Sequence, residues 1–236
     1  QKYFWGSLDS EHREKSLKDL LNRVVKQIVN WGDNGGYFTS NDEKDVFADE
    51  LMSLLLVQKA SFNSPVWFNI GVPDVPQQSS ACFILSVDDT IDSILNWYVE
   101  EGKIFKGGSG SGANLSRIRA SSEEISGGGS PSGPVSFMRG ADASAGTIKS
   151  GGTTRRAAKM VMLDVDHPDI EEFIHCKDDD DSLQNFNISV QITDEFMKAV
   201  ENDEEFALVS PRDTGDGPND EVVGTISAKD LWNDIA

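Results

Sequence analysis

Apolar residues recur at helical spacing in the first part of the chain. Between residues 11 and 31, leucine, isoleucine and valine form an amphipathic stripe, which predicts a helix that Ser10 caps and Gly32 ends. A second helix is predicted over residues 41–59, with Phe47, Leu51 and Leu55 on one face. The two helices predict a small N-terminal helical layer.

From about residue 80 onwards, short apolar runs alternate with helical stripes. Residues 81–87 form a nearly continuous apolar run, which predicts a strand buried on both faces. Asp88, Asp89 and Thr90 offer a cap for the helix that follows. Further strands are predicted over residues 160–165, 187–192 and 206–210, and further helices over residues 134–149, 168–175, 194–201 and from 228. This alternation predicts an α/β domain with much parallel sheet.

The 236-residue chain is strongly acidic, with 40 acidic and 21 basic residues and a formal net charge of −19. Such a field repels nucleic-acid backbones and anionic membranes, so we expect neither as a partner. No stretch approaches the roughly 20 apolar residues that span a bilayer. The 2 cysteines cannot form a disulfide scaffold, which favours a reducing, cytoplasmic setting.

Two glycine-rich segments carry basic side chains in the middle of the chain. Residues 108–113 match a G-x-G-x-x-A pattern, but a dinucleotide fingerprint needs a strand before it and a helix after it, and the predicted order is the reverse. Residues 106–112 are therefore either a flexible surface loop or a mobile loop whose backbone N–H groups meet a phosphate or ribose. The second segment, residues 149–156, ends in Arg155 and Arg156, whose guanidinium groups suit bidentate phosphate binding. Together the segments predict a nucleotide with several phosphates.

Chemically reactive side chains are few. Cys82 lies inside an apolar run, where a lone cysteine is most often a packed small hydrophobe. Of the 3 histidines only His167 has nearby carboxylates, and a helix cap by Asp166 before Pro168 accounts for that segment. Cys176 has no second cysteine at metal-binding spacing. No metal site is predicted.

Many segments, in order and spacing, resemble the large subunit of ribonucleotide reductases, and most of all the adenosylcobalamin-dependent class II enzymes. They cover nearly the whole chain and comprise residues 62–69, 80–84, 88–94, 105–110, 114–119, 150–158, 164–170 and 187–191. The resemblance implies a ten-stranded α/β barrel. Residues 61–236 would form its first half, after an N-terminal helical region of residues 1–60.

The resemblance also implies roles for particular side chains. Cys82 would be one of two thiols that reduce the ribose at C2′, ending in a disulfide with a cysteine from a later strand. The glycine segment with Arg119 and the segment 153–156 would form two specificity loops. Substrate would be bound by Ser64, Ser80, Ala81, Thr154, Arg155 and Arg156. A nucleoside triphosphate effector, a dNTP or ATP, would be bound by Asp89, Thr90, Ile91, Arg119 and Lys149.

Part of the family's chemistry is not carried by this sequence. In the family, adenosylcobalamin generates a cysteine thiyl radical that takes the 3′ hydrogen, and an Asn-Pro-Cys-x-Glu motif supplies that cysteine. The motif is absent, and Cys176, at the end of a predicted surface helix, is not in the context of the second reducing thiol. We therefore expect a fragment or one chain of a split enzyme, inactive alone, with the cofactor bound mainly outside this chain. The expected partners are a complementary chain with the motif, a thiol reductant such as thioredoxin, and a second copy in a dimer.

Two other interpretations stay open. One is a non-catalytic nucleotide-sensing protein on the same scaffold, which would keep the two glycine–arginine segments and use no thiol. The other is a soluble α/β domain whose glycine segments are surface loops. The stripe of Ile91, Ile94, Leu95 and Tyr98 likewise fits either a dimer interface or ordinary core packing.

Overall fold

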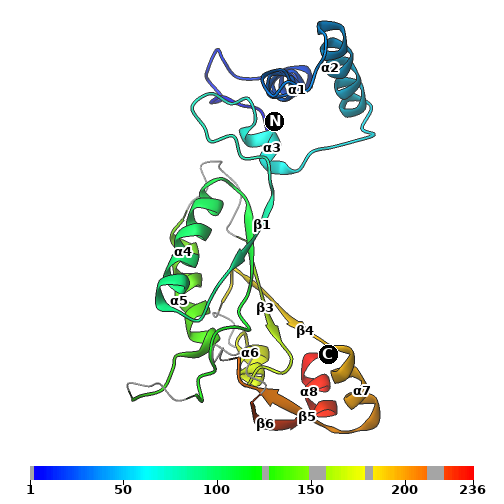
Figure 1. The fold of residues 1–236 in the computed structure, drawn as a ribbon. Coiled ribbons are helices and arrows are strands. Elements are labelled where there is room, and N and C mark those ends of the chain that lie inside the picture. Colours follow the sequence, from blue (N-terminus) through cyan, green and yellow to red (C-terminus); the bar gives the residue numbers. More distant parts are fainter. Residues whose placement is uncertain (1–2, 124–127, 149–157, 179–182, 212–220) are drawn as a thin grey trace. The chain divides into compact units, whose positions relative to one another are not determined.

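The computed structural model describes residues 3–123, 128–148, 158–178, 183–211 and 221–236. The chain divides into two compact units, Gln1–Ala81 and Cys82–Ala236. The first unit contains α1 (Leu17–Asn34), α2 (Asn41–Leu56) and α3 (Ser64–Asn69), coloured blue to cyan in Figure 1. No helix in the described ranges is long and apolar enough to cross a membrane.

Both predicted N-terminal helices are present, but α1 begins later than expected. Its N-cap is Ser16, whose Oγ accepts a hydrogen bond from the Asp19 N–H, while the Asp19 carboxylate accepts one from the Ser16 N–H. This reciprocal capping box is a stronger start signal than a lone serine. The start expected at residue 11 under Ser10 was therefore wrong, and the helix continues past Gly32 to a cap at Gly35.

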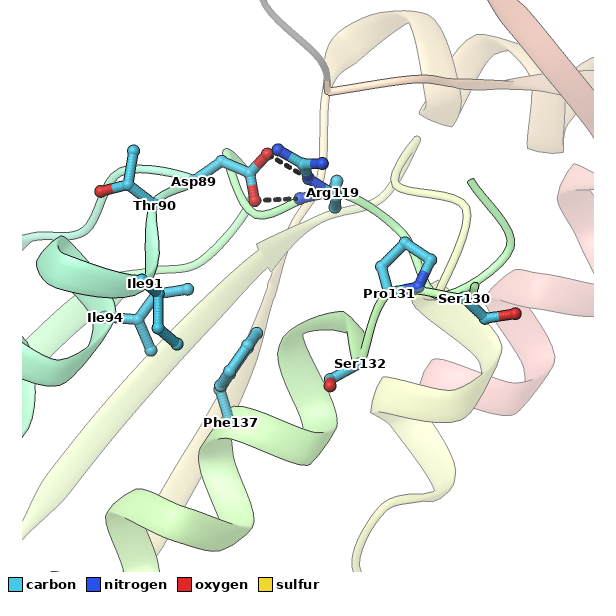
Figure 2. Close-up of a pocket in the computed structure, with 9 residues that line it drawn as sticks. All are labelled: Asp89, Thr90, Ile91, Ile94, Arg119, Ser130, Pro131, Ser132 and Phe137. Carbon is cyan, nitrogen blue, oxygen red and sulfur yellow. Dashed lines mark hydrogen bonds and ion pairs between the residues drawn. The ribbon is translucent and has the colours of Figure 1, made fainter. Parts of the chain in front are cut away.

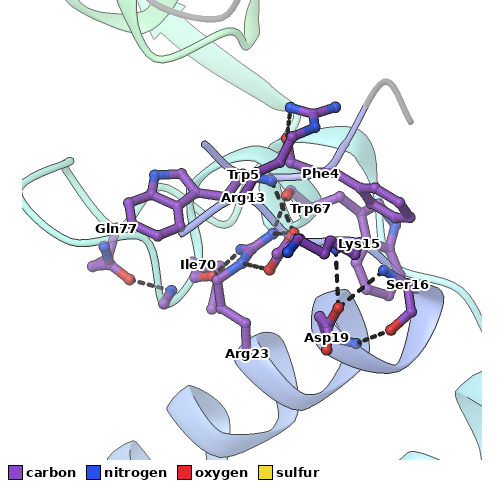
Figure 3. Close-up of polar contacts among 12 residues, drawn as sticks. Phe4, Trp5, Arg13, Lys15, Ser16, Asp19, Arg23, Trp67, Ile70 and Gln77 are labelled. Atoms are coloured by element: carbon purple, nitrogen blue, oxygen red, sulfur yellow. Dashed lines mark hydrogen bonds and ion pairs between the residues drawn. The ribbon is translucent and has the colours of Figure 1, made fainter. Parts of the chain in front are cut away.

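Arg23 of α1 connects the helices of the first unit (Figure 3). Its Nε donates to Glu14 Oε1 at 2.6 Å, its Nη2 donates to Trp67 O at 3.0 Å, and its Nη1 donates to Ile70 O. The pair is buried, so these bonds compensate the desolvation of two charges. Val24 packs in the same region against α3. The segment 61–81 thus belongs to the helical unit, and the boundary expected after residue 60 falls inside that unit.

The second unit is built on a parallel sheet of four strands in the order β1-β2-β3-β4. The strands β5 and β6 form a separate antiparallel pair. In chain order the elements are β1 (Cys82–Ser86), α4 (Ile91–Lys106), β2 (Gly110–Asn114), α5 (Gly133–Thr147), β3 (Lys159–Asp164), α6 (Ile170–His175), β4 (Phe186–Gln191), α7 (Asp194–Asn202), β5 (Glu205–Val209), β6 (Val222–Ser227) and α8 (Ala228–Ile235). The alternation of strand and helix agrees with the predicted α/β class.

Sequential order in a parallel sheet places the crossover helices on one face, because such connections are right-handed. Figure 1 shows α4 and α5 side by side along the sheet. Their face holds the core of the unit, with Val161, Leu163 and Phe186 fully buried. A sheet covered by helices on one side and open on the other is what part of an α/β barrel requires.

One strand prediction and one loop prediction for this sheet were wrong. Residues 82–86 alternate between exposed and half-buried, and Ile84 is 93% exposed, so β1 is not buried on both faces. Residues 110–114 of the first glycine segment form β2, whose backbone pairs with β1 and β3. They are therefore neither of the two expected loops, and these amides are not available to a phosphate.

Candidate functional site

A cavity of about 260 Å³ lies between the start of α4, the turn after β2 and the start of α5. Figure 2 shows its side chains, which include both polar groups and an apolar wall. The lining residues are Asp89, Thr90, Ile91, Ile94, Arg119, Ser130, Pro131, Ser132 and Phe137. Asp89, Thr90, Ile91 and Arg119, which the resemblance selected, thus lie together although about thirty residues separate them in sequence.

Asp89 and Arg119 form the polar end of this cavity. The Asp89 Oδ2 accepts a hydrogen bond from Arg119 Nε at 2.6 Å, and Oδ1 accepts one from the Arg119 backbone N–H at 3.2 Å. Both side chains are partly exposed, at 23% and 33%. Because the ion pair uses Nε, the two terminal guanidinium nitrogens are not needed for it. Such nitrogens bind phosphate or carboxylate oxygens well.

The start of α4 contributes a helix N-terminus to the cavity. Thr90 is the N-cap, and its side chain accepts a hydrogen bond from the Ser93 N–H at 3.2 Å. A threonine in this position is favoured because it satisfies an amide that the helix leaves unpaired. Ile91 and Ile94 then face the cavity together with Phe137 of α5. The cavity therefore offers a charged end and an apolar side to the same ligand.

Cys82 is exposed and is the first residue of β1. In the parallel register, Cys82 pairs with Gly110 and Ile84 pairs with Gly112, which in turn pairs with Met160. Paired residues project from the same face of a sheet, so Cys82 lies on the face away from the buried core. Beside it, two glycines add no side chain. The Cys82 thiol is thus accessible to solvent on an open sheet face where neighbouring glycines have no side chains. It is not packed in the core as a small apolar residue.

The other predicted substrate residues are not brought together by the described structure. Ser64, whose Oγ lies 3.2 Å from the Tyr3 hydroxyl, belongs to the first unit, as do Ser80 and Ala81. Ser80 is exposed and Ala81 is half-buried. Three predicted substrate residues, Thr154, Arg155 and Arg156, and the predicted effector residue Lys149 lie outside the described residues.

The second cysteine has a different environment. Cys176 is the C-cap of α6 and is buried in the main core, and not on a surface helix as the sequence suggested. Burial raises the pKa of its thiol to about 11. A thiol with such a pKa is almost entirely protonated at neutral pH and reacts slowly. Cys176 therefore has the properties of a structural residue.

The Asp166–Asp169 segment also differs from its prediction. The N-cap of α6 is Asp169, and its side chain makes no capping hydrogen bond, so Asp166 does not cap this helix. Burial, together with the neighbouring charge of Asp164, raises the pKa of Asp166. Among the described residues, no group of three or more histidine, cysteine and acidic side chains is placed to hold a metal ion.

Sequence reasoning did not identify the α5 side of the cavity. Ser130, Pro131 and Ser132 come from a serine- and glycine-rich stretch without periodicity, and Phe137 was hidden within a predicted helix. The available signal was Pro134, which predicts the start of a helix at that position. The segment just before that helix start lines the cavity.

Comparison with protein families gives two matches. Residues 80–236 match the model described as ribonucleotide reductase, barrel domain. Residues 1–58 match the model described as class II vitamin B12-dependent ribonucleotide reductase.

Individual curated proteins are similar along the same ranges. The vitamin B12-dependent ribonucleotide reductase of Streptomyces coelicolor is 55% identical, and the match covers 100% of this chain and 26% of that protein. The protein of the same name from Rhodopirellula baltica is 40% identical over 100% of this chain and 27% of its own length. The vitamin B12-dependent ribonucleoside-diphosphate reductase of Thermoplasma acidophilum is 41% identical over 73% of this chain and 22% of its own length. The chain spans about a quarter of the length of the Streptomyces coelicolor and Rhodopirellula baltica proteins.

Proposed function

The chain belongs to the ribonucleotide reductase family, with an N-terminal part of the class II, vitamin B12-dependent type, and we propose that it takes part in the reduction of ribonucleotides to deoxyribonucleotides. In this proposal the chain provides one reducing thiol and a regulatory nucleotide site. The substrate is a ribonucleoside di- or triphosphate. The observation that carries the proposal is the lining of one cavity by Asp89, Thr90, Ile91 and Arg119, the residues expected to bind the effector.

The proposed reductant is Cys82. Its thiol is exposed and lies on the open sheet face, where Cys82 pairs with Gly110, and a glycine there leaves room for a sugar to approach the strand. One thiol hydrogen would leave with the C2′ hydroxyl as water, the other hydrogen and the two electrons would form the new C2′–H bond, and a disulfide would form between the two sulfurs. Since Cys176 is buried with a raised pKa, the second thiol comes from outside this chain.

The proposed effector site is the Asp89–Arg119 cavity. The Arg119 guanidinium would bind phosphate oxygens, the Asp89 carboxylate would accept a hydrogen bond from a sugar hydroxyl, and the apolar side would contact the sugar or base. A cavity of about 260 Å³ accommodates part of a nucleotide. Lys149 would add a further phosphate contact in the same proposal.

The Asp89–Arg119 cavity does not fit adenosylcobalamin. The cavity of about 260 Å³ is far too small for a corrin ring, and its charged and apolar groups suit a nucleotide. The expectation that the cofactor binds mainly outside this chain therefore stays a prediction.

A dimer through α4 is part of the proposal. Ile91, Leu95 and Val99 are 59%, 51% and 53% exposed and follow one another at helical spacing on α4. Ile94 is buried, and the Tyr98 hydroxyl donates to Phe137 O at 2.7 Å, so these two belong to the core. The predicted stripe therefore divides into two exposed residues, Ile91 and Leu95, and two core residues, Ile94 and Tyr98. A dimer formed through the exposed apolar row would place the effector cavity near the two-fold axis of that dimer.

The proposal is tested with three variants of this chain in the complete enzyme, together with the part that carries the Asn-Pro-Cys-x-Glu motif. Cys82→Ser should abolish deoxyribonucleotide formation and leave nucleotide binding unchanged, whereas Cys176→Ala should retain turnover. Arg119→Ala should weaken binding of the effector by about 10- to 100-fold, because it removes charge-assisted bonds. Retained turnover in Cys82→Ser would refute the role of this thiol. Nucleotide binding without any turnover in the wild-type protein would favour the non-catalytic sensing protein, which the names of the relatives do not support.

A further inference from the structure

His167 and Asp169 form a buried hydrogen-bonded pair next to the nucleotide cavity. Their side chains do not line that cavity, and His167 is only 2% exposed. The Asp169 backbone N–H donates to His167 Nδ1 at 3.0 Å, and His167 Nε2 lies 2.9 Å from the Ile118 carbonyl oxygen. Because Nδ1 accepts a hydrogen bond, the proton of the neutral ring is on Nε2, which donates to Ile118 O. The ring therefore has one fixed orientation.

The Asp169 carboxylate holds the turn that carries Arg119. Its Oδ2 accepts a hydrogen bond from the Ser121 backbone N–H at 2.8 Å, and its Oδ1 accepts one from the Ser121 hydroxyl at 2.8 Å. His167 bonds to Ile118, just before Arg119, and Asp169 bonds to Ser121, two residues after it. The backbone is therefore held on both sides of Arg119. Asp169 is 6% exposed, so little water competes for its oxygens.

The Asp169 carboxylate also lies close to the start of α5, which follows the 130–132 segment that lines the other side of the cavity. Gly133 follows Ser132 directly and has a φ of +68°. A Cβ at Gly133 would lie 2.7 Å from Asp169 Oδ2 and 3.1 Å from the Ser121 Cβ, so only glycine allows this approach. Figure 2 shows the segment 130–132 across the cavity from Thr90 and Ile91. The Arg119 turn and the start of α5 therefore converge on one buried carboxylate.

We propose that Asp169, oriented by His167, is a positioning residue that fixes the distance between the two loops that wall the nucleotide cavity. The inference rests on the proposed function only for the nature of the ligand. Neither side chain touches the ligand. Loss of the carboxylate should let the 118–121 and 130–133 segments separate, and Arg119 would then spend less time in the binding geometry.

The test compares nucleotide binding and amide exchange in the intact protein. Calorimetric titration with deoxynucleoside triphosphates should give a dissociation constant that rises about tenfold or more in Asp169→Ala, the effect of losing a charge-assisted contact. Asp169→Asn keeps an acceptor for the Ser121 N–H and should recover much of the affinity. Leu231→Ala removes a buried side chain of α8 that does not line the cavity, and it should leave the dissociation constant unchanged.

Hydrogen exchange gives a readout that does not need the ligand. Peptides covering 115–123 and 128–137 should both exchange faster in Asp169→Ala than in wild type, and should not do so in Leu231→Ala. If the wild type binds no nucleotide, the proposed function fails, and the hydrogen-exchange comparison alone then tests the positioning role of Asp169. Unchanged exchange in the two peptides, or wild-type affinity in Asp169→Ala, would overturn the inference.

Discussion

Replacement of Glu101 should destabilise the protein severely, because it is the counter-ion of a buried lysine. Lys159 on β3 is 1% exposed, and its Nζ lies 2.5 Å from Glu101 Oε2 on α4. The same ammonium donates to the Ala141 carbonyl oxygen of α5 at 2.6 Å. The Ser111 hydroxyl of β2 donates to Glu101 Oε1 at 2.7 Å. One buried pair therefore links two strands and two helices.

The magnitude follows from what would remain around the ammonium. In Glu101→Ala, Lys159 keeps one carbonyl bond and the ring faces of Trp97, Phe105 and Phe186, whose centroids lie 5.6, 5.5 and 4.8 Å away. These contacts offset part of the desolvation penalty. We expect a loss of about 3–5 kcal/mol, the range for breaking a buried pair. Total stabilities are only about 5–15 kcal/mol, so this is a large fraction.

Replacing both partners should behave differently. A Glu101→Leu, Lys159→Met double variant removes both buried charges and fills a similar volume, so its stability should be near that of wild type or about 1–4 kcal/mol higher. The exposed Lys229–Asp203 pair provides a control, since its side chains are 56% and 67% exposed. Lys229→Ala should cost no more than about 1 kcal/mol.

The pH dependence has a definite sign. Burial lowers the pKa of Lys159 below its ordinary value of 10.5, and Glu101 opposes that shift. The folded state therefore binds fewer protons than the unfolded state between the lowered value and 10.5, and stability rises with pH across that window. Without Glu101 the window should extend to lower pH.

Urea unfolding followed by circular dichroism at several pH values measures these effects. The comparison needs wild type, both Glu101 variants and Lys229→Ala under identical conditions. A cost of less than about 1 kcal/mol for Glu101→Ala, typical of surface pairs, would refute the reasoning.

Three further predictions concern backbone, thiols and assembly. Gly133→Ala should cost about 1–3 kcal/mol in chemical unfolding, whereas Gly146→Ala, whose added Cβ would have no atom within 4 Å, should be neutral or stabilising by up to about 1 kcal/mol. Titration with a chromogenic disulfide should show one fast thiol, Cys82, and release of Cys176 only in denaturant; two fast thiols would contradict the burial of Cys176. Leu95→Lys should shift the protein from dimer to monomer in sedimentation velocity, and an unchanged species would exclude an α4 interface.

The strongly periodic parts of the fold were predictable from sequence. The helix α2 starts at the predicted residue, α4 follows its predicted Thr90 cap, and α5 and α7 lie within about two residues of their predicted ranges. The strands β3, β4 and β5 were found within about one residue, because apolar runs between turn signals are distinctive.

Other elements could not be found because tertiary contacts determine them. The strand β2 contains Gly110 and Gly112, which have low strand propensity, and it forms because β1 and β3 pair with it on both sides. The strand β6 (Val222–Ser227) is short and partly exposed, and its only signal is its antiparallel partner β5. A lysine in a strand normally indicates an exposed edge, so the burial of Lys159 required knowledge of Glu101 across the fold.

The candidate site was found only in part, for a related reason. The resemblance selected Asp89, Thr90, Ile91 and Arg119, and these residues share a cavity. The segment 130–132 has no pattern of its own, and its position depends on Pro134 and on the buried carboxylate of Asp169. The family resemblance therefore identified one side of the cavity, and packing determined the other.

The most direct test of the central claim is a crystal structure of the intact protein with a bound deoxynucleoside triphosphate. The account predicts density between the Thr90 end of α4 and the 130–132 segment, with phosphate oxygens on the Arg119 guanidinium. Density for the nucleotide elsewhere, with the Asp89–Arg119 cavity empty at saturating ligand, would contradict it.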